Sequence, residues 1–162
     1  MVGETMKLTN RNVVSAFQTL TQIGNMPLDP KAAYWMGRNW KQLKPLWEKV
    51  EKGRAEIIKK HGTVDPNNPN NLFVPPMIEV ESVAKEIEVD GKMVANPSRW
   101  KPNPAVELCT ADLEDLVDQE VEAVIMKIKL SAFKGHLTFQ NAEALDFMLE
   151  EDNESNLITF PR

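Results

Sequence analysis

The chain has 162 residues, of which 42% are hydrophobic and 27% are charged, and its formal net charge is −5. This length fits one compact domain, and this composition excludes a wholly disordered chain, a collagen-like repeat and a coiled-coil fibre. No apolar run approaches the ~20 residues of a membrane-spanning helix, and the first residues lack the apolar stretch of a secretion signal. We therefore expect a soluble, single-domain protein, made in a cytoplasm, without a membrane partner.

Charge is unevenly distributed along the chain. Residues 1–62 carry 11 basic and 5 acidic side chains, whereas residues 63–162 carry 8 and 19. No basic residue occurs from Asn103 to Met126, where seven acidic residues lie. Such asymmetry fits a basic arm for nucleic acid, a head-to-tail contact between copies, or two halves that pack together and cancel. We divide the predicted domain (1–162) into a basic helical part (1–62) and an acidic part (63–162).

The basic part begins with a predicted amphipathic helix. Thr9 or Asn10 can cap it, and apolar residues then recur every three or four positions until Gly24. Asp29 and Pro30 supply an N-cap and a first-turn proline for a second helix. The short connector predicts that the two helices form an antiparallel hairpin.

The second helix is expected to run to residues 59–62, where basic side chains and a glycine stop it. Pro45 lies inside the pattern and should kink or interrupt the helix near Lys41. The apolar positions step by three, four or seven residues, which predicts a stripe facing the partner helix: Ala33, Met36, Trp40, Leu43, Trp47, Val50 and Ile57.

The acidic part starts with irregular sequence. Residues 63–76 hold four prolines and four asparagines and are predicted to be a long loop. Residues 77–81 and 85–89 alternate in polarity, and Asp90-Gly91 predicts a tight turn into a return strand at 92–95. Residues 96–104 are predicted to be irregular again.

Three further elements are predicted before the C-terminus. Thr110 can cap a short acidic helix through about Asp118, and residues 121–130 form the strongest strand pattern. After a turn at 134–136, Thr138 caps a helix expected to reach Leu149. Residues 157–160 suggest an edge strand or a docking tail. In the strand, one face is predicted to hold Val124, Met126, Ile128 and Leu130, and in the last helix the inward residues are Ala142, Leu145, Met148 and Leu149.

These elements predict an α+β fold. An N-terminal antiparallel helical hairpin would pack on a small antiparallel sheet, with two shorter helices completing the layer.

Side chains that serve in catalysis and metal binding are few. Cys109 is the single cysteine, which excludes an internal disulfide and a multi-cysteine zinc site. Together with His61 or His136 and a carboxylate, Cys109 would form a nucleophile set, because an imidazole can generate the thiolate. No family spacing supports this set, and metal-binding histidine pairs and glycine-rich phosphate loops are absent from the sequence. We predict no enzyme, no catalytic or metal-ligating residue and no cofactor, with a Cys109-based activity as the alternative.

Aromatic side chains on the second helix indicate a partner site. Trp40 and Trp47 fall on the apolar stripe and are expected in the core. Tyr34 and Trp35 fall off the stripe beside Arg38, and such a group of residues is typical of interaction hot spots. Packing of the Tyr34–Trp35 pair against the strands is the alternative.

Basic side chains extend this candidate site. The helix at 30–62 carries nine Lys or Arg and three Glu, so it could follow a phosphate backbone. No base-reading motif accompanies it and the chain is acidic overall, so the sequence disfavours nucleic acid as the partner. The predicted partner-binding residues are Tyr34, Trp35, Arg38, Lys41, Lys52 and Trp100.

Seven segments, in order along most of the chain, form a distinctive set: residues 6–10 (MKLTN), 33–39 (AYWMGRN), 43–48 (LKPLWE), 55–62 (AEIIKKHG), 121–131 (VEAVIMKIKLS), 137–138 (LT) and 144–149 (ALDFML). Together these segments resemble a group of short proteins of tailed, siphovirus-type bacteriophages without a settled function. The Asn/Pro-rich loop and the Pro-rich stretch before Glu107 depart from that pattern. The resemblance brings no catalytic residues with it.

The resemblance implies a non-enzymatic bacteriophage protein that acts through protein–protein contacts, as a virion structural or assembly component. Its partners would be other phage proteins or copies of itself, in the host cytoplasm or in the virion. The alternative is an effector that binds and alters a host protein, with its acidic surface mimicking nucleic acid.

Overall fold

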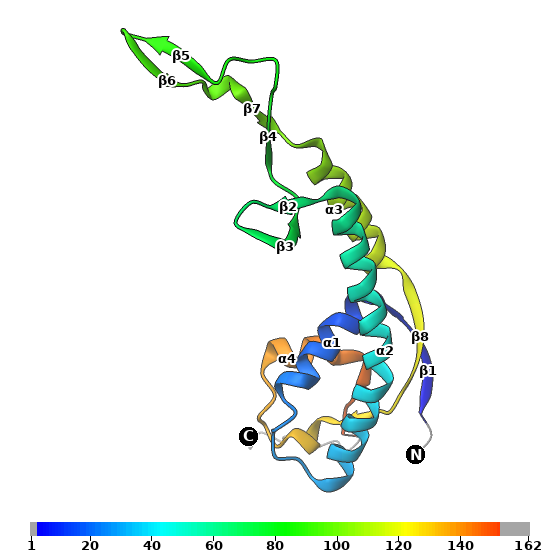
Figure 1. Ribbon diagram of the computed structural model, residues 1–162. Coiled ribbons are helices and arrows are strands. Elements are labelled where there is room, and N and C mark those ends of the chain that lie inside the picture. Colours follow the sequence, from blue (N-terminus) through cyan, green and yellow to red (C-terminus); the bar gives the residue numbers. More distant parts are fainter. Residues whose placement is uncertain (1–2, 153–162) are drawn as a thin grey trace, which may run out of the picture. The chain divides into compact units, whose positions relative to one another are not determined.

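The computed structural model describes residues 3–152 (Figure 1). Contacts divide the chain into two compact units. Among the described residues, unit 1 is formed by residues 3–51 and 117–152, and unit 2 by residues 52–116. The fold class is α+β, as predicted. The strands described form five separate two-stranded ladders, four antiparallel and one parallel.

Unit 1 starts with β1 (Glu4–Thr9), which pairs antiparallel with β8 (Glu120–Ile125). The sequence patterns predict β8 but no strand at residues 4–9. The partner of β1 is β8, which lies far away in the sequence, so local periodicity carries little information about whether residues 4–9 form a strand.

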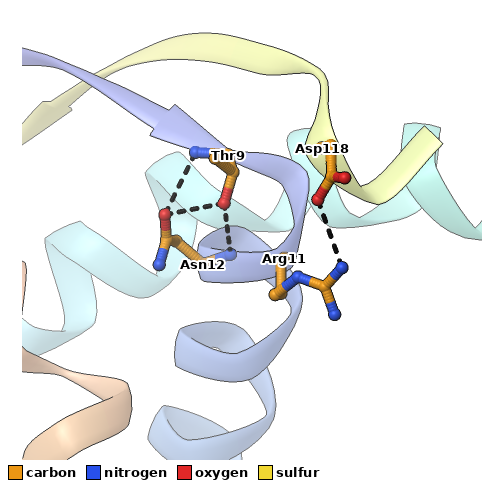
Figure 2. Close-up of polar contacts among 4 residues, drawn as sticks. All are labelled: Thr9, Arg11, Asn12 and Asp118. Atoms are coloured by element: carbon orange, nitrogen blue, oxygen red, sulfur yellow. Dashed lines mark hydrogen bonds and ion pairs between the residues drawn. The ribbon is translucent and has the colours of Figure 1, made fainter. Parts of the chain in front are cut away.

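The helix α1 (Asn10–Gln22) begins as predicted, with Thr9 as its N-cap. The Thr9 hydroxyl accepts a hydrogen bond from the Asn12 N–H at 3.2 Å, and the Asn12 amide oxygen accepts one from the Thr9 N–H at 3.1 Å (Figure 2). This reciprocal capping box satisfies two backbone donors at the helix start. Beside it, the Arg11 guanidinium lies 3.2 Å from the carboxylate of Asp118 (Figure 2).

The helix α2 (Pro30–His61) begins at the predicted cap, where Asp29 accepts from the Ala32 N–H at 3.1 Å. Phe17 of α1 stacks on Trp40 and Trp47 of α2, with ring centroids 5.4 and 4.6 Å apart. The predicted helical hairpin is therefore confirmed.

Two details of α2 differ from the prediction. Of the kink or interruption expected near Lys41, the interruption does not occur: both Pro45 and Lys41, whose carbonyl loses its helical donor, are exposed residues, so water can replace that bond. The stripe is also displaced at its start, because Ala32 is buried whereas Ala33 is exposed. The buried positions of α2 are Ala32, Met36, Asn39, Leu43 and Val50.

Asn39 joins α2 to the end of β8. Its side chain is fully buried, its amide nitrogen donates to the Met126 carbonyl at 2.8 Å, and its amide oxygen accepts from the Met126 N–H at 2.8 Å. These bonds satisfy both backbone groups of Met126, which lies between β8 and β9 (Ile128–Lys129).

The break at Met126 overturns the predicted strand face. Ala123 and Ile125 are buried and Val124 is exposed, so the inward side in β8 is the one predicted to face outward. Met126 and Ile128 are buried as well, because the alternation restarts after the break. Leu130 is exposed at the start of a short 3₁₀ helix, η2 (Leu130–Phe133).

The last described segment of unit 1 is more broken than predicted. The turn at residues 134–136 forms as predicted, and Thr138 caps α4 (Phe139–Ala144). This helix ends five residues earlier than expected and is followed by the 3₁₀ helix η3 (Asp146–Met148) and by β10 (Leu149–Glu150), which pairs parallel with β9. The 3₁₀ turn stacks residues three apart, so Leu145 and Met148 are both fully buried. Residues 157–160 lie outside the described residues.

The hydrophobic core of the described chain lies in unit 1. It gathers side chains from β1, both helices of the hairpin, β8, β9 and the segment after them. Its fully buried or nearly buried members are Leu8, Val13, Ala16, Phe17, Leu20, Ile23, Ala32, Met36, Leu43, Ala123, Ile125, Ile128, Phe133, Leu145 and Met148.

In unit 2 the end of α2 packs beside α3 (Pro104–Asp118), most of which belongs to this unit. A Cβ at Gly53 would come 3.2 Å from Leu116, so the glycine allows the two helices to approach closely. α3 begins six residues before the predicted cap at Thr110. Asn103 caps it instead, accepting from the Ala105 N–H at 3.0 Å, with Pro104 as the first helical residue.

Residues 63–76 are not the continuous loop expected, since β2 (Thr63–Asp65) and β3 (Asn68–Phe73) pair antiparallel. A two-stranded ladder leaves the outer side of each strand unpaired, where a proline costs no ladder hydrogen bond. Pro69 falls within the irregular part of the register, and Asp65 accepts from the Asn67 N–H at 2.8 Å to close the turn.

The rest of unit 2 is a long two-stranded ribbon, residues 75–103, which we call the ribbon (Figure 1). β4 (Met77–Glu79) pairs with β7 (Trp100–Pro102), and β5 (Glu86–Val89) pairs with β6 (Lys92–Ala95). Between β6 and β7 lies the 3₁₀ helix η1 (Pro97–Arg99). Residues 96–104 are expected to be irregular throughout, and this prediction is wrong for β7.

The turn at the end of the ribbon is the predicted one. Asp90 and Gly91 have φ values of 52° and 75°, as a tight hairpin turn requires. Asn96 and Asn103 hold the irregular parts of the ribbon, donating to the carbonyls of Ala84 and Pro75 at 2.9 and 2.8 Å.

Candidate interaction site

Three exposed residues of the predicted partner site lie together on α2, next to the half-buried Trp35. Tyr34, Arg38 and Lys41 follow one another at spacings of four and three residues, and so share one side of the helix with Lys31. We call Lys31, Tyr34, Arg38 and Lys41 the basic face. Within residues 3–152, none of its three cations takes part in an ion pair.

The two aromatic residues of the predicted site have different surroundings. Tyr34 is 56% exposed and meets Trp35 edge-on, with ring centroids 4.8 Å apart. Trp35 is half-buried and packs against the core of unit 1. Its indole N–H is enclosed without a hydrogen-bond partner in the described part of the chain.

The other two predicted residues belong to unit 2. Lys52 is exposed and lies eleven positions beyond Lys41 on α2. Trp100 is exposed in β7, where the Arg99 guanidinium lies 5.0 Å from its ring centroid, and the Arg99 Nε lies 3.6 Å from a carboxylate oxygen of Glu79. Trp100 is therefore part of the ribbon and not of the basic face.

An open groove of about 400 Å³ lies between the end of α1 and the start of α2. No pattern in the sequence predicts this groove, because the irregular connector at residues 23–29 forms one side of it. Gly37 leaves it open, since a Cβ there would meet nothing within 4 Å, and Lys41 lines it. The apolar lining consists of Leu20, Ile23, Met26, Leu28, Ala33, Met36 and Trp40.

Unit 2 exposes large apolar side chains. Met93 is the most exposed among those of the ribbon, at 62%. Only Cys109 and Asn96 are buried in this unit. Its exposed apolar residues are Val64, Leu72, Met77, Val89, Met93, Val94, Trp100, Val106 and Leu108.

The charge asymmetry of the sequence is largely cancelled by the fold. Among the described residues, unit 1 contains 10 basic and 12 acidic residues, and unit 2 contains 8 and 11. Ion pairs join the basic and acidic parts of the sequence, with Arg11 on Asp118 and Lys60 on Asp112 at 3.2 and 2.9 Å. These pairs agree with one of the three explanations of the asymmetry, in which the basic residues 1–62 and the acidic residues 63–162 pack together and cancel.

A polar cluster connects the end of α2 to α3. His61 Nε2 lies 2.7 Å from an Asp112 carboxylate oxygen, and Lys60 Nζ lies 2.9 Å from the same atom. Hydrogen bonds from His61 and then Lys60 hold the pKa of Asp112 below its ordinary value. Cys109, one turn earlier on α3, is buried and makes no hydrogen bond to His61 in the described structure.

No group of three or more histidine, cysteine or acidic side chains is placed to hold a metal ion in residues 3–152. None of the helices described there is both long and apolar enough to cross a membrane. No family model matches the chain, and no match was found among curated proteins or solved structures.

Proposed function

We propose that this protein is a non-enzymatic bacteriophage protein that acts through protein–protein contacts as a virion structural or assembly component. The phage assignment is supported by the resemblance of the sequence segments. The contact function is supported by the fold of unit 2.

The observation that carries the proposal is the exposure of unit 2. Its strands occur as two-stranded ladders, which are marginally stable in water when nothing covers them. Large apolar residues such as Met93 and Trp100 remain in contact with solvent, and grouped exposed apolar residues mark interaction surfaces. A binding partner that covers the ribbon would supply the burial that the isolated unit lacks.

The effector alternative has weaker support. A nucleic-acid mimic presents a continuous acidic surface, but Asp112 and Asp118 of the acidic α3 are paired with Lys60 and Arg11. Neither unit carries a large excess of acidic residues.

Hydrogen exchange of the full chain, alone and within purified phage particles or assembly intermediates, tests the proposal. We expect the amides of β5 and β6 to exchange rapidly in the isolated chain and to slow at least tenfold on assembly, because burial by a partner suppresses local opening. The amides of β8 serve as the internal control and should change little. A chain that is absent from particles and intermediates, and whose ribbon is unaffected by any phage component, would refute the proposal.

A further inference from the structure

We propose that the groove and basic face of one copy bind the tip of the ribbon, residues 86–95, of a second copy. This inference rests on the proposed function and names a partner and two surfaces for it. Because the two surfaces differ, repetition of the contact would join copies head to tail.

The tip of the ribbon has one acidic face that carries a single protruding apolar side chain. Glu88 is directly opposite Met93, and Glu86 is opposite Ala95. Cross-strand partners and residues two apart lie on the same face of a strand pair, so Glu86, Glu88 and Met93 share a face. The opposite face of the tip holds Ile87, Val89, Lys92 and Val94.

The groove offers matching chemistry. Its lining is apolar, Gly37 leaves space in it, and the Lys41 side chain borders it. Arg38 lies one turn before Lys41 and, like it, has no carboxylate partner among the described residues. The neighbouring Lys44 is engaged, because its Nζ lies 3.9 Å from Glu48 and 5.3 Å from the Trp40 ring centroid.

The complementarity is both apolar and electrostatic. The flexible, polarizable side chain of Met93 suits an irregular apolar groove. On the neighbouring strand β5, Glu86 and Glu88 would meet Arg38 and Lys41 as charge-assisted hydrogen bonds. Association of two tips with each other would instead place Glu86, Glu88 and Asp90 against the same acidic residues, which opposes that arrangement.

Sedimentation of the full-length chain over a range of concentrations tests the contact. We expect concentration-dependent association that weakens as salt is raised, because exposed charge pairs are screened. The double variants Arg38→Glu/Lys41→Glu and Glu86→Lys/Glu88→Lys should each raise the dissociation constant roughly tenfold or more. Matched charge reversals elsewhere, Lys134→Glu and Glu81→Lys, should leave it within about twofold.

Rescue separates recognition from misfolding. A chain that carries all four reversals, or an equimolar mixture of the two double variants, should regain association because opposite charges again face each other. Met93→Thr should weaken association at least tenfold, whereas Val94→Thr, on the same strand but the other face, should not.

A chain that stays monomeric at all concentrations, or reversals that leave association unchanged or that fail to rescue one another, would overturn the inference. A monomeric chain whose ribbon becomes protected in phage assemblies would overturn this contact and leave the proposed function standing.

Discussion

Both units contain helices and paired strands, but only in unit 1 do these elements bury a cluster of hydrophobic side chains. Every buried hydrophobic residue of the described chain lies in unit 1 except Cys109. In unit 1 the β1–β8 ladder contributes Leu8, Ala123 and Ile125 to the core. The ladders of unit 2 have no comparable residues, so hydrogen-bonded pairing alone does not make a strand part of a core.

Unit 2 is held by other interactions. Asn96 and Asn103 bond the backbone of the ribbon, and His61, Lys60 and Asp112 link α2 to α3. Hydrogen bonds contribute little net free energy when water can replace them, whereas apolar burial contributes in proportion to its area. We therefore expect unit 1 to determine global stability and unit 2 to open locally.

The largest expected effect is the loss of a core aromatic residue in unit 1. Phe133 is 1% exposed, so Phe133→Ala should lower the free energy of unfolding by about 3–5 kcal/mol, measured by denaturant titration. The matched control is Phe139→Ala in α4, where the ring is 82% exposed, and it should cost less than about 0.5 kcal/mol. Equal losses for the two variants would contradict the assignment of the core.

Removal of the buried amide in unit 1 comes next. Asn39→Ala leaves the N–H and carbonyl of Met126 without their side-chain partners, so unfolding free energy should fall by about 2–4 kcal/mol. Hydrogen exchange at the Met126 amide should accelerate as well. Gln42→Ala, at an exposed position of the same helix, is the control, and an effect as large as that of Asn39→Ala would argue against the pairing.

Two glycine substitutions compare the units directly. Gly91→Ala places a side chain at φ +75°, which should destabilise the tip of the ribbon by about 1–2 kcal/mol and accelerate exchange in β5 and β6 but not in β8. Gly37→Ala, in a helix with free space around the Cβ, should stabilise unit 1 by up to about 1 kcal/mol. A global loss of stability in Gly91→Ala would contradict local opening of unit 2.

The smallest effect is the pH dependence from Asp112. The pKa of this carboxyl is lowered from 3.8 in the folded chain, so its contribution to stability is present above that value and is lost as the pH falls through the folded pKa. Asp112→Asn should therefore flatten the decline of unfolding free energy below about pH 4. Glu114→Gln, which removes an exposed carboxyl from the same helix, is the control, and an unchanged acid decline in Asp112→Asn would refute the assignment.

Local signals in the sequence predict the starts of elements well. Thr9, Asp29 and Thr138 cap the helices that they are predicted to cap, and Asp90-Gly91 forms the predicted turn. Each of these signals acts within three or four residues, so no tertiary information is needed. Asn103-Pro104 has the same pattern as Asp29-Pro30, and would have located the start of α3.

Tertiary contacts explain the main errors. β1 depends on a distant partner, and the face of β8 depends on a break where Asn39 holds the Met126 backbone. The groove depends on how the connector folds over α1 and α2, which no periodicity records. For the site, helical spacing predicts that Tyr34, Arg38 and Lys41 share one side of α2. It does not reveal that Trp100 belongs to the ribbon and not to that surface.

The order of synthesis matters for a unit assembled from both ends of the sequence. Leu8 emerges from the ribosome long before Leu145 and Met148, which belong to the same hydrophobic core. The whole of residues 52–116 is made before unit 1 can close. During translation the apolar face of α1 therefore remains uncovered on one side, and a nascent chain stopped before Met148 presents that face to chaperones or to aggregation.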